Sequence, residues 1–157
     1  MDNDVVARLQ YQLNVERQNA QKYFYFGSVA SNLAWDGFAH WFMKQGQGEL
    51  GHAEMIKDFL ISKCIQPEYR PLAGVSVESS LIAVTKEAFK TELATTAELT
   101  VLYQMADESG EHQVCAFLVD LLKEQIEEET VTANLMDLVS KTDENGWVTL
   151  DEIYGKK

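Results

Sequence analysis

FAHWFMKQGQGELGHAEMIKDF, residues 38–59, is the stretch that decides the fold, because its apolar residues recur with the period of an α-helix. Alternate steps of four and three residues trace one helix face: Phe38, Phe42, Gln45, Glu49, His52, Ile56 and Phe59. Both ends of this face are apolar, whereas its middle carries a carboxylate and an imidazole. Since residues three apart share one face of a helix, Glu49 and His52 can reach the same ion. The stretch therefore predicts a core-facing helix with a metal-binding pair near its centre.

The helical pattern continues on both sides of this stretch and divides the chain into helices. Both prolines lie in 64–80, the one stretch with loop character, and further breaks fall at Gly110 and Gly146. We expect Asp36 to be the N-cap of the second helix. Strand-like alternation is absent, so the predicted fold class is all-α. The expected helices cover residues 4–34, 37–64, 79–108 and 111–140, and a short fifth helix covers about 147–154.

Each of the four long helices carries polar residues in the middle of its apolar face. These residues are mostly ionisable and lie at similar depth: Glu16, Glu49, His52, Glu92, Gln125 and Glu128. A buried carboxylate without a partner costs several kcal/mol, and several carboxylates together repel one another. A bound cation is the simplest compensation for such a cluster.

The spacing of these polar residues repeats along the chain. Glu16 and Glu49 are 33 residues apart, and His52 follows Glu49 after 3 residues. The same spacings of 33 and 3 recur 76 residues later, at Glu92, Gln125 and Glu128. The repeat indicates two helical hairpins related by an approximate two-fold axis and joined by a long crossover. We expect one domain over residues 1–157, with the four-helix bundle over about 4–140.

Charge and composition disfavour several classes of partner. The chain has 13 basic and 25 acidic residues and a net charge of −12, which argues against nucleic acids and anionic membranes. No apolar run approaches the ~20 residues of a transmembrane helix. Residues 1–4 lack the features of a signal peptide, and Cys64 and Cys115 are too few for a disulfide scaffold. We expect a cytoplasmic protein whose natural ligands are cations.

Five motifs spread over nearly the whole chain carry a family resemblance. In order, they are Glu16 with Tyr23, FAHWF at 38–42, ELGHAE at 49–54, Glu92, and EQIEEE at 124–129. As a set they resemble the ferritins, specifically the non-haem bacterial type. The resemblance implies a ferritin-like four-helix bundle that assembles as a homo-oligomeric shell of about 24 subunits. It also implies oxidation of Fe(II) by O2 or peroxide and storage of the product as a ferric mineral.

The resemblance assigns ligands for two iron ions in each subunit. Glu16, Glu49 and His52 resemble the ligands of the first ferroxidase iron. Glu49, Glu92 and Glu128 resemble those of the second, with Glu49 bridging both ions. A haem-bearing relative would show a second Glu-x-x-His motif ending at position 128, where this chain has Glu128. No haem is therefore expected.

The resemblance assigns further residues around this centre. Gln125 would lie beside the second iron, and Tyr23 would be a nearby tyrosine that hydrogen-bonds a ligand or gives up an electron. Many bacterial ferritins have a third iron position, for which Glu124 and Glu127 are the candidates here. The third glutamate expected for that position is replaced by Gly48, so the third site is weakened or absent.

Two other functions remain open from the sequence. The first is a ferritin-like di-iron oxidase or peroxidase that forms no storage cage. The second is a non-catalytic, acidic helical interaction protein that binds no stoichiometric metal.

A separate feature of the sequence, residues 143–152, resembles much of a calcium-binding EF-hand loop, but Lys141 stands at its first ligand position. We therefore expect a turn into the short fifth helix at this point.

Overall fold

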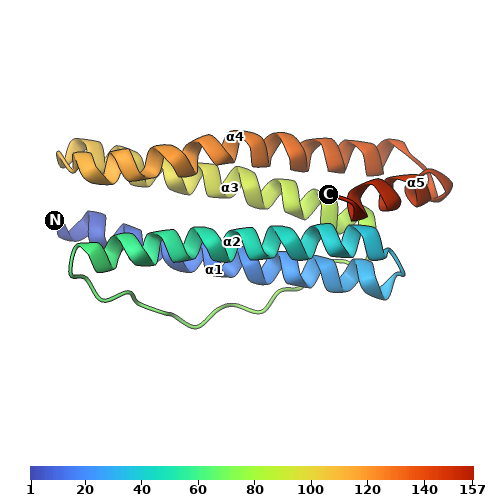
Figure 1. Ribbon diagram of the computed structural model, residues 1–157, viewed down its shortest axis with the longest axis horizontal. Coiled ribbons are helices and arrows are strands. Elements are labelled where there is room, and N and C mark those ends of the chain that lie inside the picture. The colour runs from blue at the N-terminus through green and yellow to red at the C-terminus, as the bar shows by residue number, and fades with distance from the viewer.

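The computed structural model describes residues 1–157 and contains five helices and no strand. The helices are α1 (Asn3–Asn32), α2 (Asp36–Ser62), α3 (Leu81–Glu108), α4 (His112–Lys141) and α5 (Glu144–Gly155). The four long helices lie side by side, and α5 is inclined across one end of them against α2 (Figure 1). The predicted all-α class, four-helix bundle and short C-terminal helix are confirmed.

Short polar side chains fix the beginnings of three helices. Asp2, Ser80 and Asp143 precede α1, α3 and α5, and each accepts hydrogen bonds from backbone N–H groups of the first turn. Because Asp143 caps α5, this helix begins at Glu144, three residues before the expected start. Residues 144–152 are consequently helical, and the loop that resembles an EF-hand in sequence does not form.

The beginning of α2 differs from the prediction. Trp35 occupies the N-cap position without a side-chain hydrogen bond, and Asp36 is already helical. The backbone N–H of Phe38 instead donates to Asp151 Oδ1 of α5, at 2.9 Å. A Cβ atom on Gly37 would lie 1.8 Å from the Asp151 carbonyl oxygen, so glycine permits this close approach. The cap comes from a residue distant in sequence, which the local pattern could not indicate.

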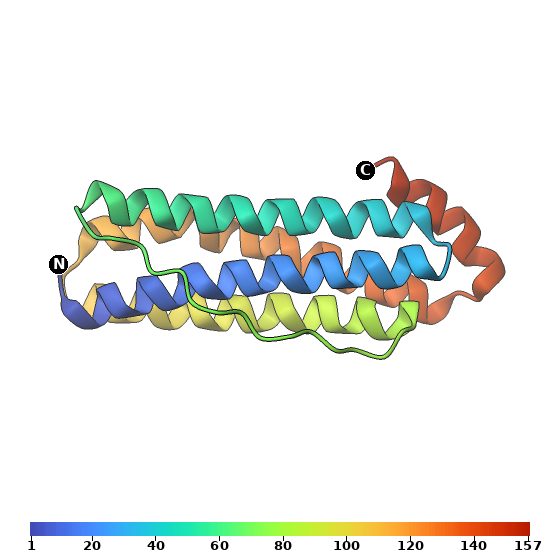
Figure 2. The same ribbon diagram turned by 90° about the horizontal axis from the view of Figure 1, so that it is seen from below.

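The crossover between α2 and α3 is extended and follows the length of α1 (Figure 2). Gln10 shows how it is held: its Nε2 donates to the Gln66 carbonyl at 2.9 Å, and its Oε1 accepts from the Glu68 N–H at 2.8 Å. Side chains about one turn apart on α1 continue these bonds to the crossover backbone: Asn14, Arg17, Gln18, Gln21 and Tyr25. Amide side chains carry both a donor and an acceptor, so they satisfy an extended backbone much as a neighbouring strand would.

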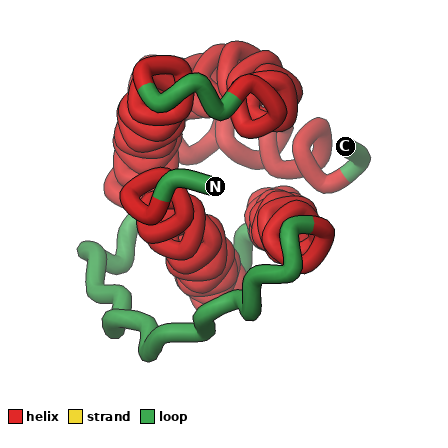
Figure 3. Tube along the Cα trace, turned by 90° about the vertical axis from the view of Figure 1, so that its left-hand side faces the viewer, coloured by secondary structure: helices red, strands yellow, loops and turns green.

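The apolar core consists of two clusters, one toward each end of the bundle. Tyr23, Phe38 and Phe42 belong to the cluster beside α5, whereas Leu9 and Leu118 belong to the other. The view along the bundle shows the four long helices arranged around a common axis (Figure 3). A layer of buried polar side chains interrupts the apolar faces between them: Glu16, Glu49, Glu92 and Gln125. None of the helices is long and apolar enough to span a membrane.

Candidate metal centre

Three of the predicted ligands meet in the polar layer. Glu16 of α1 and Glu49 and His52 of α2 each offer a ligand atom, and these atoms all lie within 4.8 Å of one another. The two carboxylates are buried and His52 is partly buried. His52 Nδ1 is 3.2 Å from Glu49 Oε2 and 3.9 Å from Glu16 Oε2. The nitrogen that faces both carboxylates is therefore Nδ1.

The proton on His52 balances the charge of this group. Burial acts to lower the pKa of His52, but the neighbouring carboxylates of Glu16 and Glu49 outweigh burial and raise the pKa to about 11. Burial likewise acts to raise the pKa of Glu16, yet the neighbouring side chains of His52 and Glu49 lower it. The pKa of Glu49 is raised well above its ordinary value, first by burial and then by the charges of Glu16 and Glu92. A metal cation that binds here must displace the His52 proton.

Glu92 lies on the opposite side of the layer, on α3, and is held by neutral donors. Tyr23 donates its hydroxyl proton to Glu92 Oε1 at 2.5 Å. Gln125 Nε2 donates to Glu92 Oε2 at 3.1 Å, to the Glu92 carbonyl at 3.2 Å and to Thr96 Oγ1 at 3.2 Å. Burial and the charge of Glu92 raise the pKa of Tyr23 well above its ordinary value, so its phenol remains protonated at neutral pH. Tyr23 and Gln125 therefore both contact Glu92, one of the predicted ligands of the second iron.

Glu128 of α4 lies close enough to Glu92 for the two carboxylate charges to repel each other. Its Oε2 atom is buried and has no hydrogen-bond partner. Burial, followed by the nearby charge of Glu92, raises the pKa of Glu128 to about 7. Glu16 Oε2 is likewise buried without a hydrogen-bond partner. Two of the predicted ligands thus each keep a buried carboxylate oxygen without a hydrogen-bond donor, and a bound cation would take the place of that donor.

The donor set suits a particular kind of ion. Carboxylate oxygens and a single imidazole suit divalent first-row metals, Fe(II) among them. Glu16, Glu49 and His52 form a compact group, while Glu92 and Glu128 lie outside it. The five predicted ligands therefore divide into one tight group and two flanking carboxylates around a shared layer.

The candidates for a third site behave differently from each other. Glu124 of α4 is half exposed, and one of its oxygens forms a short contact with His52 Nε2. Glu127 is exposed and has no such contact. A Cβ atom on Gly48 would meet nothing within 4 Å, so no side chain from that position enters the layer. Glu124 thus orients His52, and the three positions form no third cluster.

Sequence analysis missed two polar residues that border the layer. Gln12 is buried and its Nε2 donates to Glu16 Oε1 at 3.2 Å. Asn19 is buried and its Nδ2 donates to Thr95 Oγ1 of α3 at 2.8 Å. Gln12 lies four residues before Glu16, a helical spacing that could have indicated the contact. No spacing could have indicated the bond between Asn19 and Thr95, because it joins different helices.

The sequence of the chain matches a known protein family. Residues 6–142 match the ferritin family, described as Ferritin-like domain. The bacterial non-heme ferritin of Staphylococcus aureus (strain USA300) is 24% identical over 132 residues, covering 83% of this chain and 80% of the relative. That of Staphylococcus haemolyticus (strain JCSC1435) is 22% identical over 142 residues, covering 90% and 86%.

Solved structures agree with the fold. An open pore ferritin from the hyperthermophilic archaeon Archaeoglobus fulgidus superposes with a TM-score of 0.96 at 23% identity, covering 100% of this chain and 99% of that one. A humanized archaeal ferritin also gives a TM-score of 0.96 at 23% identity, covering 100% and 97%. The family match spans most of the chain and includes every residue of the polar layer; this chain belongs to the ferritin family.

Proposed function

We propose that this chain is an iron-storage ferritin that oxidises Fe(II) at a di-iron centre within each subunit. Residues 1–157 would form one domain, and the subunits would assemble as a hollow cytoplasmic cage of about 24 copies. The ferric product would collect inside the cage as a mineral. Family membership and the relatives named bacterial non-heme ferritin support this assignment.

One observation carries the ferroxidase part of the proposal. Glu16, Glu49 and His52 place three ligand atoms within 4.8 Å of one another in a buried layer. An acidic, solvated helix face would not need to bury these groups, and burial without a cation is costly. The partnerless oxygens of Glu16 and Glu128 are further positions where a cation would replace missing donors.

The residues present divide naturally between two Fe(II) ions, which are the substrate of the reaction. Glu16, Glu49 and His52 would hold the first ion. Glu49 would bridge to the second ion, which Glu92 and Glu128 would complete. Carboxylates stabilise Fe(III) better than Fe(II), so this donor set favours the loss of one electron from each ion to O2 or peroxide.

Tyr23 and Gln125 would assist without binding iron tightly. Both hold Glu92 through hydrogen bonds, and so both would set the position of this carboxylate at the second ion. The amide of Gln125 is a neutral group where a tighter di-iron site would have a further charged ligand. A second ion held mainly by carboxylates can leave after oxidation, as storage requires.

Stopped-flow absorbance of the apo-protein mixed with Fe(II) in air tests this function. The wild-type chain is expected to oxidise Fe(II) rapidly, whereas Glu49→Ala, which removes the bridging ligand, loses the rapid phase. Glu54→Ala is the matched control, since Glu54 is an exposed glutamate on the same helix. Equal rates in the wild type, both variants and buffer would contradict the proposal and favour an interaction protein without a metal centre.

A further inference from the structure

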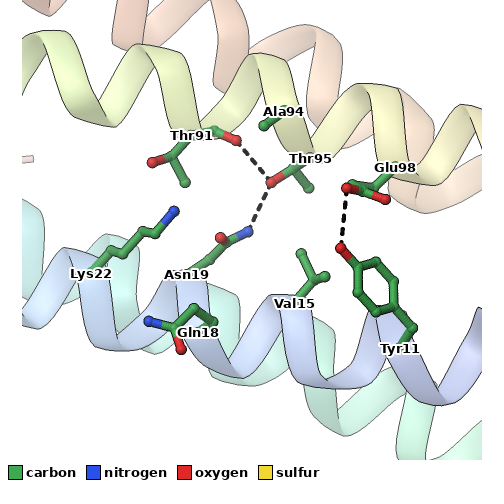
Figure 4. A pocket seen from close by; sticks show the side chains of 9 residues that line it. All are labelled: Tyr11, Val15, Gln18, Asn19, Lys22, Thr91, Ala94, Thr95 and Glu98. Atoms are coloured by element: carbon green, nitrogen blue, oxygen red, sulfur yellow. Dashed lines mark hydrogen bonds between the residues drawn. The ribbon is translucent and has the colours of Figure 1, made fainter. Parts of the chain in front are cut away.

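A cleft of about 200 Å³ lies between α1 and α3, on the flank of the bundle (Figure 4). Most of the residues that line it are polar. The volume leaves room for several molecules of the size of water, each of which takes about 30 Å³ in the liquid. The cleft therefore fits a small polar molecule and no large substrate.

The floor of this cleft lies at the level of the metal centre. Asn19 and Thr95 line it, and the hydrogen bond between them, 2.8 Å long, joins the two helices. Asn19 lies three residues after Glu16, and Thr95 lies three residues after Glu92. Figure 4 shows that α1 and α3 run in opposite directions. By these sequence spacings, the Asn19–Thr95 pair therefore lies along the bundle between the levels of the two carboxylates. The cleft thus lies at the same level along the bundle as the metal-binding layer, and the Asn19–Thr95 bond forms part of its lining.

A buried hydroxyl in the cleft has no partner. Thr91 is only 3% exposed, it lines the cleft, and its Oγ1 atom forms no hydrogen bond. A hydroxyl can donate one hydrogen bond and accept others, so this group requires a small partner of either kind. Leaving it unpaired in a buried position costs free energy. The partner must enter through the cleft.

The charges at the cleft select against cations. The amine of Lys22 points across the cleft toward Thr91 and takes part in no ion pair (Figure 4). Glu98, at the other end of the cleft, is already paired with Arg8 and accepts a hydrogen bond from Tyr11 at 3.2 Å. The one uncompensated charge is therefore positive, and it repels Fe(II) while leaving neutral molecules unaffected.

We propose that this cleft admits hydrogen peroxide to the metal centre, with the Asn19–Thr95 pair as its gate. Hydrogen peroxide is small, neutral and able both to donate and to accept hydrogen bonds, as the lining demands. The inference rests on the proposed ferroxidase function. Two Fe(II) ions each give one electron, the O–O bond breaks, and two protons are taken up, so that one peroxide yields two water molecules. Iron itself reaches the centre by another route.

Filling the cleft tests the proposal. Ala94 lines the cleft on α3 and is exposed, so Ala94→Phe blocks the cleft while leaving the Asn19–Thr95 bond and every predicted iron ligand in place. The matched control is Ala97→Phe, because Ala97 is exposed on the same helix outside the cleft. Under anaerobic conditions, each protein is loaded with Fe(II) and mixed with hydrogen peroxide in a stopped-flow instrument. Fe(II) binding is measured separately by anaerobic calorimetry.

We expect Ala94→Phe to oxidise iron about tenfold more slowly with peroxide, and Ala97→Phe to match the wild type. Fe(II) binding should be equal in all three proteins, because iron does not pass through the cleft. Equal peroxide rates in the wild type and Ala94→Phe would overturn the inference, and so would a loss of Fe(II) binding in Ala94→Phe. A wild-type chain that binds no Fe(II) would contradict the proposed function itself, which separates the two failures.

Discussion

At the scale of single residues, His52 decides the properties of the layer, because both of its ring nitrogens contact carboxylates. Nδ1 faces Glu49 and Glu16, while Nε2 contacts Glu124 from α4. A histidine that binds a metal through one nitrogen commonly donates the other N–H to a carboxylate, which fixes its tautomer and orientation. Glu124 fits this role, although the sequence made it a candidate for a third iron.

The first prediction concerns Glu124. Removing an outer-shell partner of this kind typically lowers metal affinity about 10- to 100-fold. We expect a loss in this range for Glu124→Ala, measured by anaerobic Fe(II) titration. Glu127→Ala removes the same charge from the same helix without touching His52, and should bind Fe(II) almost as the wild type does. Equal losses in the two variants would show that only local charge matters.

The second prediction concerns pH. Glu128 has a pKa raised to about 7 and His52 one raised to about 11, so both hold protons in the metal-free protein at mildly acidic pH. Fe(II) must displace these protons, and its affinity therefore rises with pH, with the Glu128 contribution between about pH 6 and 8. Anaerobic calorimetry in buffers of different ionisation enthalpy should show more protons released per iron at the acidic end. In Glu128→Gln the number of protons released per iron should no longer depend on pH in this range. If the dependence were unchanged, the released proton would come from a group other than Glu128.

At the scale of elements, residues near the helix ends predict where most helices begin and end. These predictions fail where a residue distant in the sequence fixes the helix end. The breaks around the prolines and Gly110 were predicted within a few residues. Asp36 was predicted wrongly as a cap, because Asp151 of α5 satisfies the start of α2. The attachment of the crossover to α1 was also not predicted. Its hydrogen bonds come from amide side chains of α1, and nothing in the sequence of the crossover itself indicates them.

The third prediction concerns the glycines of α2. A Cβ atom at Gly46 would lie 2.4 Å from Phe24 Cε1, whereas Gly48 and Gly51 face open space. Alanine in a helix is favoured over glycine by about 1 kcal/mol, so Gly48→Ala and Gly51→Ala should each stabilise the monomer fold by up to that amount. Gly46→Ala must displace the Phe24 ring and should destabilise it by about 1–3 kcal/mol. Chemical denaturation of the three variants checks this order; a gain at Gly46 would contradict the close contact.

At the scale of the whole molecule, the repeat of 33 and 3 residues predicted the four-helix bundle and its polar layer correctly. The all-α class and the family resemblance are confirmed. Periodicity succeeded because burying one apolar face of each helix leaves few arrangements. The roles of the individual ligands remain predictions, since contacts between helices, such as Glu92 with Tyr23, depend on how the bundle closes.

The fourth prediction concerns assembly. Light scattering on the purified protein should give a mass about 24 times the 17.8 kDa of one chain. Glu49→Ala should assemble to the same size, because Glu49 is buried inside one bundle rather than between bundles. A monomeric or dimeric wild type would contradict the cage and favour a ferritin-like oxidase.

The central claim, a two-iron centre within each subunit, is tested most directly by anomalous X-ray scattering at the iron edge. Crystals of the wild-type protein would be soaked anaerobically in Fe(II). We predict two anomalous peaks per chain, one among Glu16, Glu49 and His52 and the other among Glu49, Glu92 and Glu128. A single peak, or none within the polar layer, would contradict the di-iron centre.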